Sequence, residues 1–210
     1  MNISITGTLG SGKSSVCKIL KENGYDIISN GVLFREIAEE KGITVVELNE
    51  LAKKDKSIDD MLDERSIRLG KELDSTIFDS RMGWHFIPDS FKVFLLADMT
   101  EAGRRVYNDN RVSESYNDPA TAKADLIKRQ LMEKKRFSDL YQTDYLNLNN
   151  YDLVIESTYA TPDQIAEQIL KGVEEKVMSQ AKLNPKSLYP AEEAKDEGEI
   201  LVTPIHNKFI

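Results

Sequence analysis

The residues with the clearest chemistry stand near the beginning of the chain. Gly7 to Ser14 read GTLGSGKS and match G-x-x-x-x-G-K-[ST] without a gap, a pattern typical of loops that bind nucleoside triphosphates. The glycines allow the backbone to curl so that successive N–H groups point at an anion. Lys13 can reach the outer phosphates, and the Ser14 hydroxyl is placed to bind Mg²⁺. The predicted nucleotide contacts are Gly7, Gly10, Ser11, Gly12, Lys13, Ser14 and Ser15.

A second group of residues, the arginines, could act on the same phosphates. Arginine matches phosphate oxygens through two hydrogen bonds, and arginines that meet in one cleft stabilise the charge that develops in phosphoryl transfer. Arg129 and Arg136 are seven positions apart and Glu133 lies between them, which places all three on one helix face. Solvated surface charge is the alternative for any single arginine. The candidates are Arg35, Arg81, Arg105, Arg111, Arg129 and Arg136.

Asp79 directly precedes the segment Ser80-Arg81-Met82-Gly83-Trp84 at the end of an apolar stretch. Its carboxylate could hold a magnesium-bound water, orient Arg81 through an ion pair, or cap the turn that follows. We interpret Trp84 as a core residue rather than as a platform on which a base stacks. Cys17, the single cysteine, excludes an internal disulfide and is interpreted as a small buried apolar residue.

The elements that must position these residues alternate between strand and helix. Short apolar strands that alternate with helices predict an α/β fold with a parallel sheet covered on both faces. Ligands then bind at the carboxyl ends of the strands, where the phosphate loop and Asp79 would meet. Three successive helices are expected between the second and third strands, after a turn at Asn30-Gly31. Thr44 with Glu47 predicts a capping box for the second of these helices, and Ser57 with Asp60 predicts the start of the third. We predict strands at 2–6, 25–29, 76–79, 91–97 and 151–157, with helices at 13–22, 32–41, 44–54, 57–73, from 100, at 120–141 and at 162–180.

Composition narrows the class of protein. The chain has 210 residues, 30% of them charged, and a formal net charge of −8. This acidic balance argues against a DNA- or RNA-binding protein, and the absence of a long apolar run argues against a membrane span. We expect a monomeric cytoplasmic protein with small-molecule nucleotide partners and no targeting peptide. Residues 181–210 are expected to be an extension: a linker followed by a strand-like segment, or a disordered tail.

Several longer segments resemble the cytidylate kinases, most closely the compact archaeal-type branch. The resemblance covers about residues 1–172 and is carried by SNGVLFREIAEEKGITVVEL, DKSIDDMLDER, DSRMGW, IKRQLMEKKRFSDLYQTD and YDLVIES. It implies a P-loop three-layer α/β/α fold with a five-stranded parallel sheet, in a domain of about residues 1–180. It also implies a helical segment for the nucleoside monophosphate near 32–73 and a lid near 105–136. The expected reaction is transfer of the γ-phosphate of ATP, with Mg²⁺, to CMP or dCMP.

The resemblance also implies roles for individual residues. Lys13 and Ser14 match contacts to ATP and Mg²⁺, and Arg105 matches an arginine near the ATP base or phosphates. Arg35 and Arg81 match residues that grip the monophosphate. The expected catalytic residues are Lys13, Arg81, Arg129 and Arg136, and the expected acceptor contacts are Arg35, Asp59, Asp79, Arg81 and Glu133.

The chain departs from the family at two points. Family members usually carry Glu-Gly-Arg where this chain has Asp79-Ser80-Arg81, and the lid segment NDNRVSESYNDP contains a single basic residue, Arg111. Two alternatives therefore stand beside a CMP or dCMP kinase. One is a kinase for another nucleotide or a small metabolite, and the other is a regulatory module that binds nucleotide without transferring phosphate.

Overall fold

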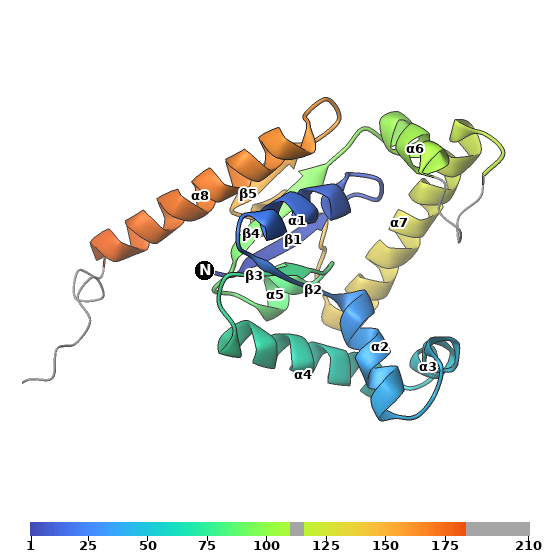
Figure 1. Ribbon diagram of the computed structural model, residues 1–210. Helices are drawn as coiled ribbons and strands as arrows, with labels where there is room; N and C mark the ends of the chain where they lie inside the picture. The colour runs from blue at the N-terminus through green and yellow to red at the C-terminus, as the bar shows by residue number, and fades with distance from the viewer. Residues whose placement is uncertain (110–115, 184–210) are drawn as a thin grey trace, which may run out of the picture.

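A five-stranded parallel sheet organises the protein (Figure 1). The computed structural model describes residues 1–109 and 116–183, with only the backbone of residues 182 and 183. The strands follow the order β2-β3-β1-β4-β5, so the chain places the phosphate-loop strand at the centre. They are β1 (Ile3–Gly7), β2 (Asp26–Ser29), β3 (Thr76–Asp79), β4 (Phe91–Leu96) and β5 (Leu153–Glu156).

Helices connect these strands, as the alternating pattern predicts. The described helices are α1 (Lys13–Glu22), α2 (Asn30–Glu40), α3 (Val45–Ala52), α4 (Ser57–Glu72), α5 (Gly83–Phe86), α6 (Met99–Asn108), α7 (Pro119–Tyr141), the 3-10 helix η1 (Leu148–Asn150) and α8 (Pro162–Leu183). The three helices expected between the second and third strands are α2, α3 and α4. Among the described residues, no helix combines the length and the apolar character needed to cross a membrane.

Alternation along β1 explains why helices cover both faces of the sheet. Ile3 and Ile5 are fully buried and pack with residues of α1 and α8 in the main core. Ser4 points to the opposite face, where a Cβ added to Gly83 of α5 would lie 3.2 Å from the Ser4 side chain. The sheet therefore lies between two helical layers, and the expected α/β/α arrangement is confirmed.

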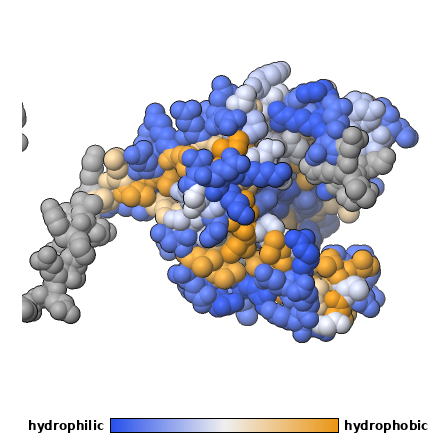
Figure 2. All heavy atoms as spheres, in the orientation of Figure 1, coloured by the Kyte–Doolittle hydropathy of each residue, from blue (hydrophilic) through white to orange (hydrophobic). Residues whose placement is uncertain are grey.

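The helices between β2 and β3 have a small core of their own. Ile37, Ala38, Leu48 and Ile58 are buried together, and this cluster is separate from the core beneath the sheet. Figure 1 shows α2 and α3 standing away from the sheet. Over α3, apolar side chains reach the surface (Figure 2), and Val46 is 71% exposed.

The helix caps correct three details of the sequence prediction. Asn30 and Gly31 were expected to form a turn, but they are the first residues of α2, whose N-cap is Ser29. The Ser57–Asp60 capping pair predicted for α4 is wrong, because Lys56 is the N-cap and makes no side-chain cap bond. Helix α6 begins one residue before Thr100, at Met99, because the Asp98 carboxylate accepts from the N–H groups of Thr100 and Glu101.

Other local predictions are confirmed. Thr44 and Glu47 form the expected capping box at the start of α3. Cys17 is buried, and its burial raises the pKa of the thiol to about 12, so the group behaves as an apolar residue. Helix α8 continues to Leu183, three residues beyond the predicted end. The predictions for Arg111 and for the extension beyond residue 183 lie outside the described residues.

Candidate active site

The phosphate loop joins β1 to α1 and depends on glycine at three positions. A Cβ on Gly7 would overlap the carbonyl oxygen of Leu95 in the neighbouring strand β4. Gly10 and Gly12 have φ values of +75° and +86°, which non-glycine residues rarely adopt. Gly12 is also the N-cap of α1 and supplies no side-chain acceptor. The first N–H groups of α1 therefore remain available to an anion at the positive end of the helix.

This loop forms the floor of a cavity of about 590 Å³. The other walls come from Arg81, from Arg105 and Asp109 at the end of α6, and from residues between Ser157 and Ile165. The Ser11 hydroxyl at this cavity is buried and has no hydrogen-bond partner in the described structure. A glycine-built cradle, an unsatisfied hydroxyl and a lysine together fit a triphosphate, so the residues present suit ATP and its Mg²⁺.

Lys13 and Asp79 form an ion pair across the carboxyl ends of β1 and β3. The Lys13 Nζ lies 2.8 Å from Asp79 Oδ1, and both side chains are largely buried. Of the three alternatives for Asp79, the ion pair with Arg81 is not formed, since Asp79 pairs with Lys13 and Arg81 pairs with Glu133. Asp79 instead holds the lysine that is expected to reach the outer phosphates of ATP.

Arg81 joins the phosphate loop to the long helix α7. Its Nε donates to Glu133 Oε2 at 2.8 Å, and Nη1 donates to the carbonyl oxygen of Gly7 at 3.1 Å. The Tyr145 hydroxyl lies 3.4 Å from the same Glu133 oxygen. Burial, and then the charge of Glu133, raise the pKa of the Tyr145 hydroxyl, so this group stays protonated. Glu133 therefore acts as the carboxylate that orients Arg81.

Ser80 replaces the glycine usual in the family, and its side chain points into the protein interior. Its hydroxyl accepts a hydrogen bond from the N–H of Met82 at 3.2 Å, and its carbonyl accepts from Thr6 Oγ1 at 2.7 Å. Ser80 is 9% exposed. The hydroxyl closes the turn between β3 and α5 in the way that serine commonly does, and this turn carries Arg81.

Arg105 is fixed against the loop that follows β5. Its Nη2 donates to the carbonyl oxygens of Ser157 and Thr158 at 2.8 and 2.7 Å, and its Nε donates to Glu101 at 3.0 Å. Hydrogen bonds from Arg104 and then Arg105 lower the pKa of Glu101 to about 2. The guanidinium group is thus held at the wall of the phosphate-loop cavity.

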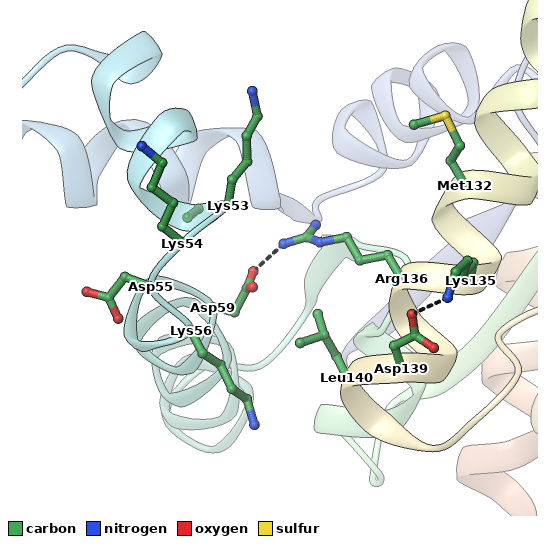
Figure 3. Close-up of a pocket in the computed structure, with 11 residues that line it drawn as sticks. Lys53, Lys54, Asp55, Lys56, Asp59, Met132, Lys135, Arg136, Asp139 and Leu140 are labelled. Carbon is green, nitrogen blue, oxygen red and sulfur yellow. Dashed lines mark hydrogen bonds and ion pairs between the residues drawn. The ribbon is translucent and has the colours of Figure 1, made fainter.

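Asp59 and Arg136 meet in a second cavity, of about 530 Å³, between the α3–α4 connection and α7 (Figure 3). Arg136 Nη2 lies 2.6 Å from Asp59 Oδ1. Met132 and Leu140 of α7 and Ala52 of α3 supply apolar walls. Asp59 and Arg136 are 77 positions apart in the sequence, and the fold brings them together on opposite walls.

Among the candidate arginines that the structure describes, Arg35 and Arg129 line neither of these cavities. Arg35 is exposed on α2, where its Nη1 lies 3.8 Å from a Cβ added to Gly31. Arg129 lies on α7 with Nη1 4.0 Å from Asp125 Oδ2. Arg129, Glu133 and Arg136 share one face of the continuous helix α7 but have different partners, since Glu133 contacts Arg81 and Arg136 contacts Asp59.

Sequence reasoning missed Tyr145 and the hydrogen-bonded pair of Tyr141 and Asp63, all of which lie close to these site residues. Tyr145 is almost fully buried beside Glu133, and the Tyr141 hydroxyl donates to Asp63 Oδ2 at 2.8 Å. Tyr141 and Asp63 are 78 positions apart, so no local spacing connects them. The weak signal available was the cluster of aromatic residues at the end of the helix predicted at 120–141.

The sheet order, the phosphate loop and the arginines around it define a P-loop kinase. A model of the cytidylate kinase-like family matches residues 2–159, and the chain belongs to that family. The family expected from the sequence is therefore confirmed, and the protein is a kinase.

Two curated relatives and one solved structure illustrate this similarity. The cytidylate kinase of Sulfolobus acidocaldarius is 34% identical over 185 residues, covering 86% of this chain and 98% of the relative. That of Halobacterium salinarum is 32% identical over 210 residues, covering 99% and 97%. The shikimate kinase structure from Bacteroides thetaiotaomicron, 14% identical with a TM-score of 0.54, covers 85% of this chain and 98% of its own. This last similarity shows the fold alone.

Proposed function

We propose that the protein transfers the γ-phosphoryl group of ATP to a nucleoside monophosphate, with CMP or dCMP as the acceptor. Arg81 is the observation that carries the proposal, because its guanidinium group contacts both Gly7 of the phosphate loop and Glu133 of α7. A cation in that position lies between the donor phosphates and an acceptor on the α7 side. The identity of CMP rests on the cytidylate kinase relatives.

Each residue of the donor side has a physical role in this proposal. The glycine-built loop binds the phosphates of ATP through backbone N–H groups, and Lys13 exchanges Asp79 for the outer phosphates when ATP arrives. Ser14 would hold Mg²⁺, which neutralises charge on the phosphate oxygens when it is bound. Arg105 is proposed to contact the ATP base or phosphates from the cavity wall.

The acceptor side combines Arg81 with the walls of the second cavity. Arg81 stabilises the charge that develops on the moving phosphoryl group, and the fixed carboxylate of Glu133 holds it in place. Asp59 is proposed to lie beside the acceptor base, with Arg136 across from it. Arg35 and Arg129 remain proposed phosphate contacts, which requires α2 and α7 to approach the phosphate loop as the cleft closes.

The test is an acceptor panel in which ADP release is measured with ATP, Mg²⁺ and either CMP, dCMP, UMP, AMP or shikimate. We expect CMP and dCMP to support release far better than the others, since a site with fixed hydrogen-bond partners rejects bases that leave these partners unpaired. A Lys13→Ala variant is the control for contaminating kinase. Efficient release with AMP or shikimate alone would assign another acceptor, and binding of ATP without release for any acceptor would contradict transfer.

A further inference from the structure

Two side-chain contacts in register join α4 to α7. Asp59 Oδ1 accepts from Arg136 Nη2 at 2.6 Å, and Asp63 Oδ2 accepts from the Tyr141 hydroxyl at 2.8 Å. Asp59 and Asp63 are four positions apart on α4, so they project from the same face of the helix one turn apart. The first contact involves residues already placed at the acceptor side. The second has no role in the proposed reaction.

Tyr141 is also anchored to the segment that follows Arg81. Its ring packs edge-on against Phe86 of α5, with centroids 5.3 Å apart, and lies nearly parallel to Phe137 at 6.1 Å. The Arg136 guanidinium lies over the Phe137 ring, 5.9 Å from its centroid. The Tyr141 side chain therefore contacts α5 through Phe86, α4 through Asp63, and the Phe137 ring over which Arg136 lies.

Burial of the Asp63 carboxylate is energetically unfavourable, which is unexpected for a contact that only holds two helices together. The carboxylate is partly buried, and this burial raises its pKa to about 6 although Tyr141 donates to it. Asp59 and Asp60 on the same helix raise this pKa further, and Arg136 of α7 lowers it. An apolar pair would hold two helices together at least as well, whereas a hydrogen bond fixes their separation and register.

We propose that Asp63 and Tyr141 are positioning residues of the acceptor site, whose hydrogen bond sets the spacing of α4 and α7 at which Asp59 and Arg136 face the acceptor. This inference rests on the proposed function. Asp63 and Tyr141 act through Asp59 and Arg136 and need not touch the acceptor themselves. Loss of the bond should weaken acceptor binding while the phosphate-loop cavity, which contains neither residue, keeps its affinity for ATP.

The kinetic test compares Tyr141→Phe and Asp63→Leu with Asp63→Asn. Tyr141→Phe and Asp63→Leu remove the hydrogen bond and are expected to raise the KM for CMP about tenfold with little change in the KM for ATP. Asp63→Asn keeps an oxygen that can accept from Tyr141 and should stay close to wild type. The matched controls are Tyr107→Phe on α6 and Glu64→Gln on α4, both at exposed positions. An unchanged KM for CMP, or equal changes for both substrates, would overturn the proposal.

A distance measurement separates this inference from the proposed reaction. Cysteines are introduced at exposed Glu64 of α4 and Lys128 of α7 and labelled with nitroxide spin labels. Pulsed electron paramagnetic resonance then measures the distance between the two helices. The buried Cys17 is not expected to react with the label. We expect a narrow distance distribution in the otherwise wild-type chain and a broader one with Tyr141→Phe. Identical distributions would overturn the inference whatever the substrate is. If no acceptor is phosphorylated but the distribution broadens, the proposed function fails and the bond still sets the helix spacing.

Discussion

At the scale of single residues, Arg81 is held at two points that belong to different parts of the fold. The Gly7 carbonyl lies in the phosphate loop and the Glu133 carboxylate on α7. The Arg81 side chain is 17% exposed, so its charge lies in a region where electrostatic interactions are stronger than in water. An arginine fixed in this way needs little reorganisation as charge develops on a transferring phosphoryl group.

We therefore expect Arg81→Ala to lower kcat/KM for phosphoryl transfer by about 10³-fold or more. The affinity for ATP, measured by calorimetry, should remain largely intact because the loop backbone and Lys13 supply most of the donor contacts. Arg68→Ala is the matched control, since Arg68 is an exposed arginine whose partner is Glu72 on the same helix. Near-normal turnover of the Arg81 variant would show that another cation stabilises the transition state.

At the scale of elements, α6 and α7 approach each other closely at Gly103. A Cβ on Gly103 would lie 2.8 Å from the carbonyl oxygen of Pro119 and 2.8 Å from the Cβ of Lys123. Two of the neighbouring atoms, Pro119 O and Lys123 Cα, belong to the backbone of α7, so they cannot move unless the helix moves. Arg105 follows two positions later on α6 and contacts the loop after β5. The α6–α7 contact therefore fixes one wall of the phosphate-loop cavity.

Gly103→Ala should force α6 away from α7, lower the melting temperature and raise the KM for ATP. We expect a loss of about 1–3 kcal/mol in the free energy of unfolding, the usual cost of overpacking. Gly31→Ala on α2 is the control, because the nearest atoms lie 3.8 Å from its added Cβ. There alanine should be neutral or slightly stabilising through helix propensity. Chemical denaturation checks both variants, and equal effects would show that the close approach is not what matters.

The elements also show which parts of the fold local sequence could predict. The strand–loop–helix arrangement around Gly7–Ser14, the α1 bounds and the Thr44–Glu47 capping box depend on contacts within a few residues, and these predictions are confirmed. The start of α2 was predicted two residues too late because Asn-Gly is a common turn pair, and local preference did not show that Ser29 caps the helix instead. The partners of Arg81 and Asp79 depend on side chains 52 and 66 positions away. Such pairings follow from how the helices lie on the sheet, which residue spacing does not encode.

At the scale of the whole molecule, the parts that bind the two proposed substrates have separate cores. The α2–α4 cluster is distinct from the core beneath the sheet, and α6 and α7 share a third cluster that includes Ala102 and Leu126. Side-chain contacts such as Asp63–Tyr141 connect these parts. A change in the charge of a group between two such parts, such as the Asp63 carboxyl, is therefore expected to change the stability of the whole protein.

The Asp63 carboxyl should make this link visible as a pH dependence of stability. Because burial raises its folded-state pKa to about 6, above the ordinary value near 4, the native protein binds this proton more tightly than the unfolded chain. The contribution of Asp63 to stability is then fully present below the unfolded pKa and is lost as pH rises toward and through 6. Asparagine does not titrate and still accepts from Tyr141. The melting temperature of Asp63→Asn, relative to wild type, should therefore be higher at pH 8 than at pH 5. A difference that stays constant between these pH values, or reverses, would show that Asp63 is ionised in the native protein throughout this range.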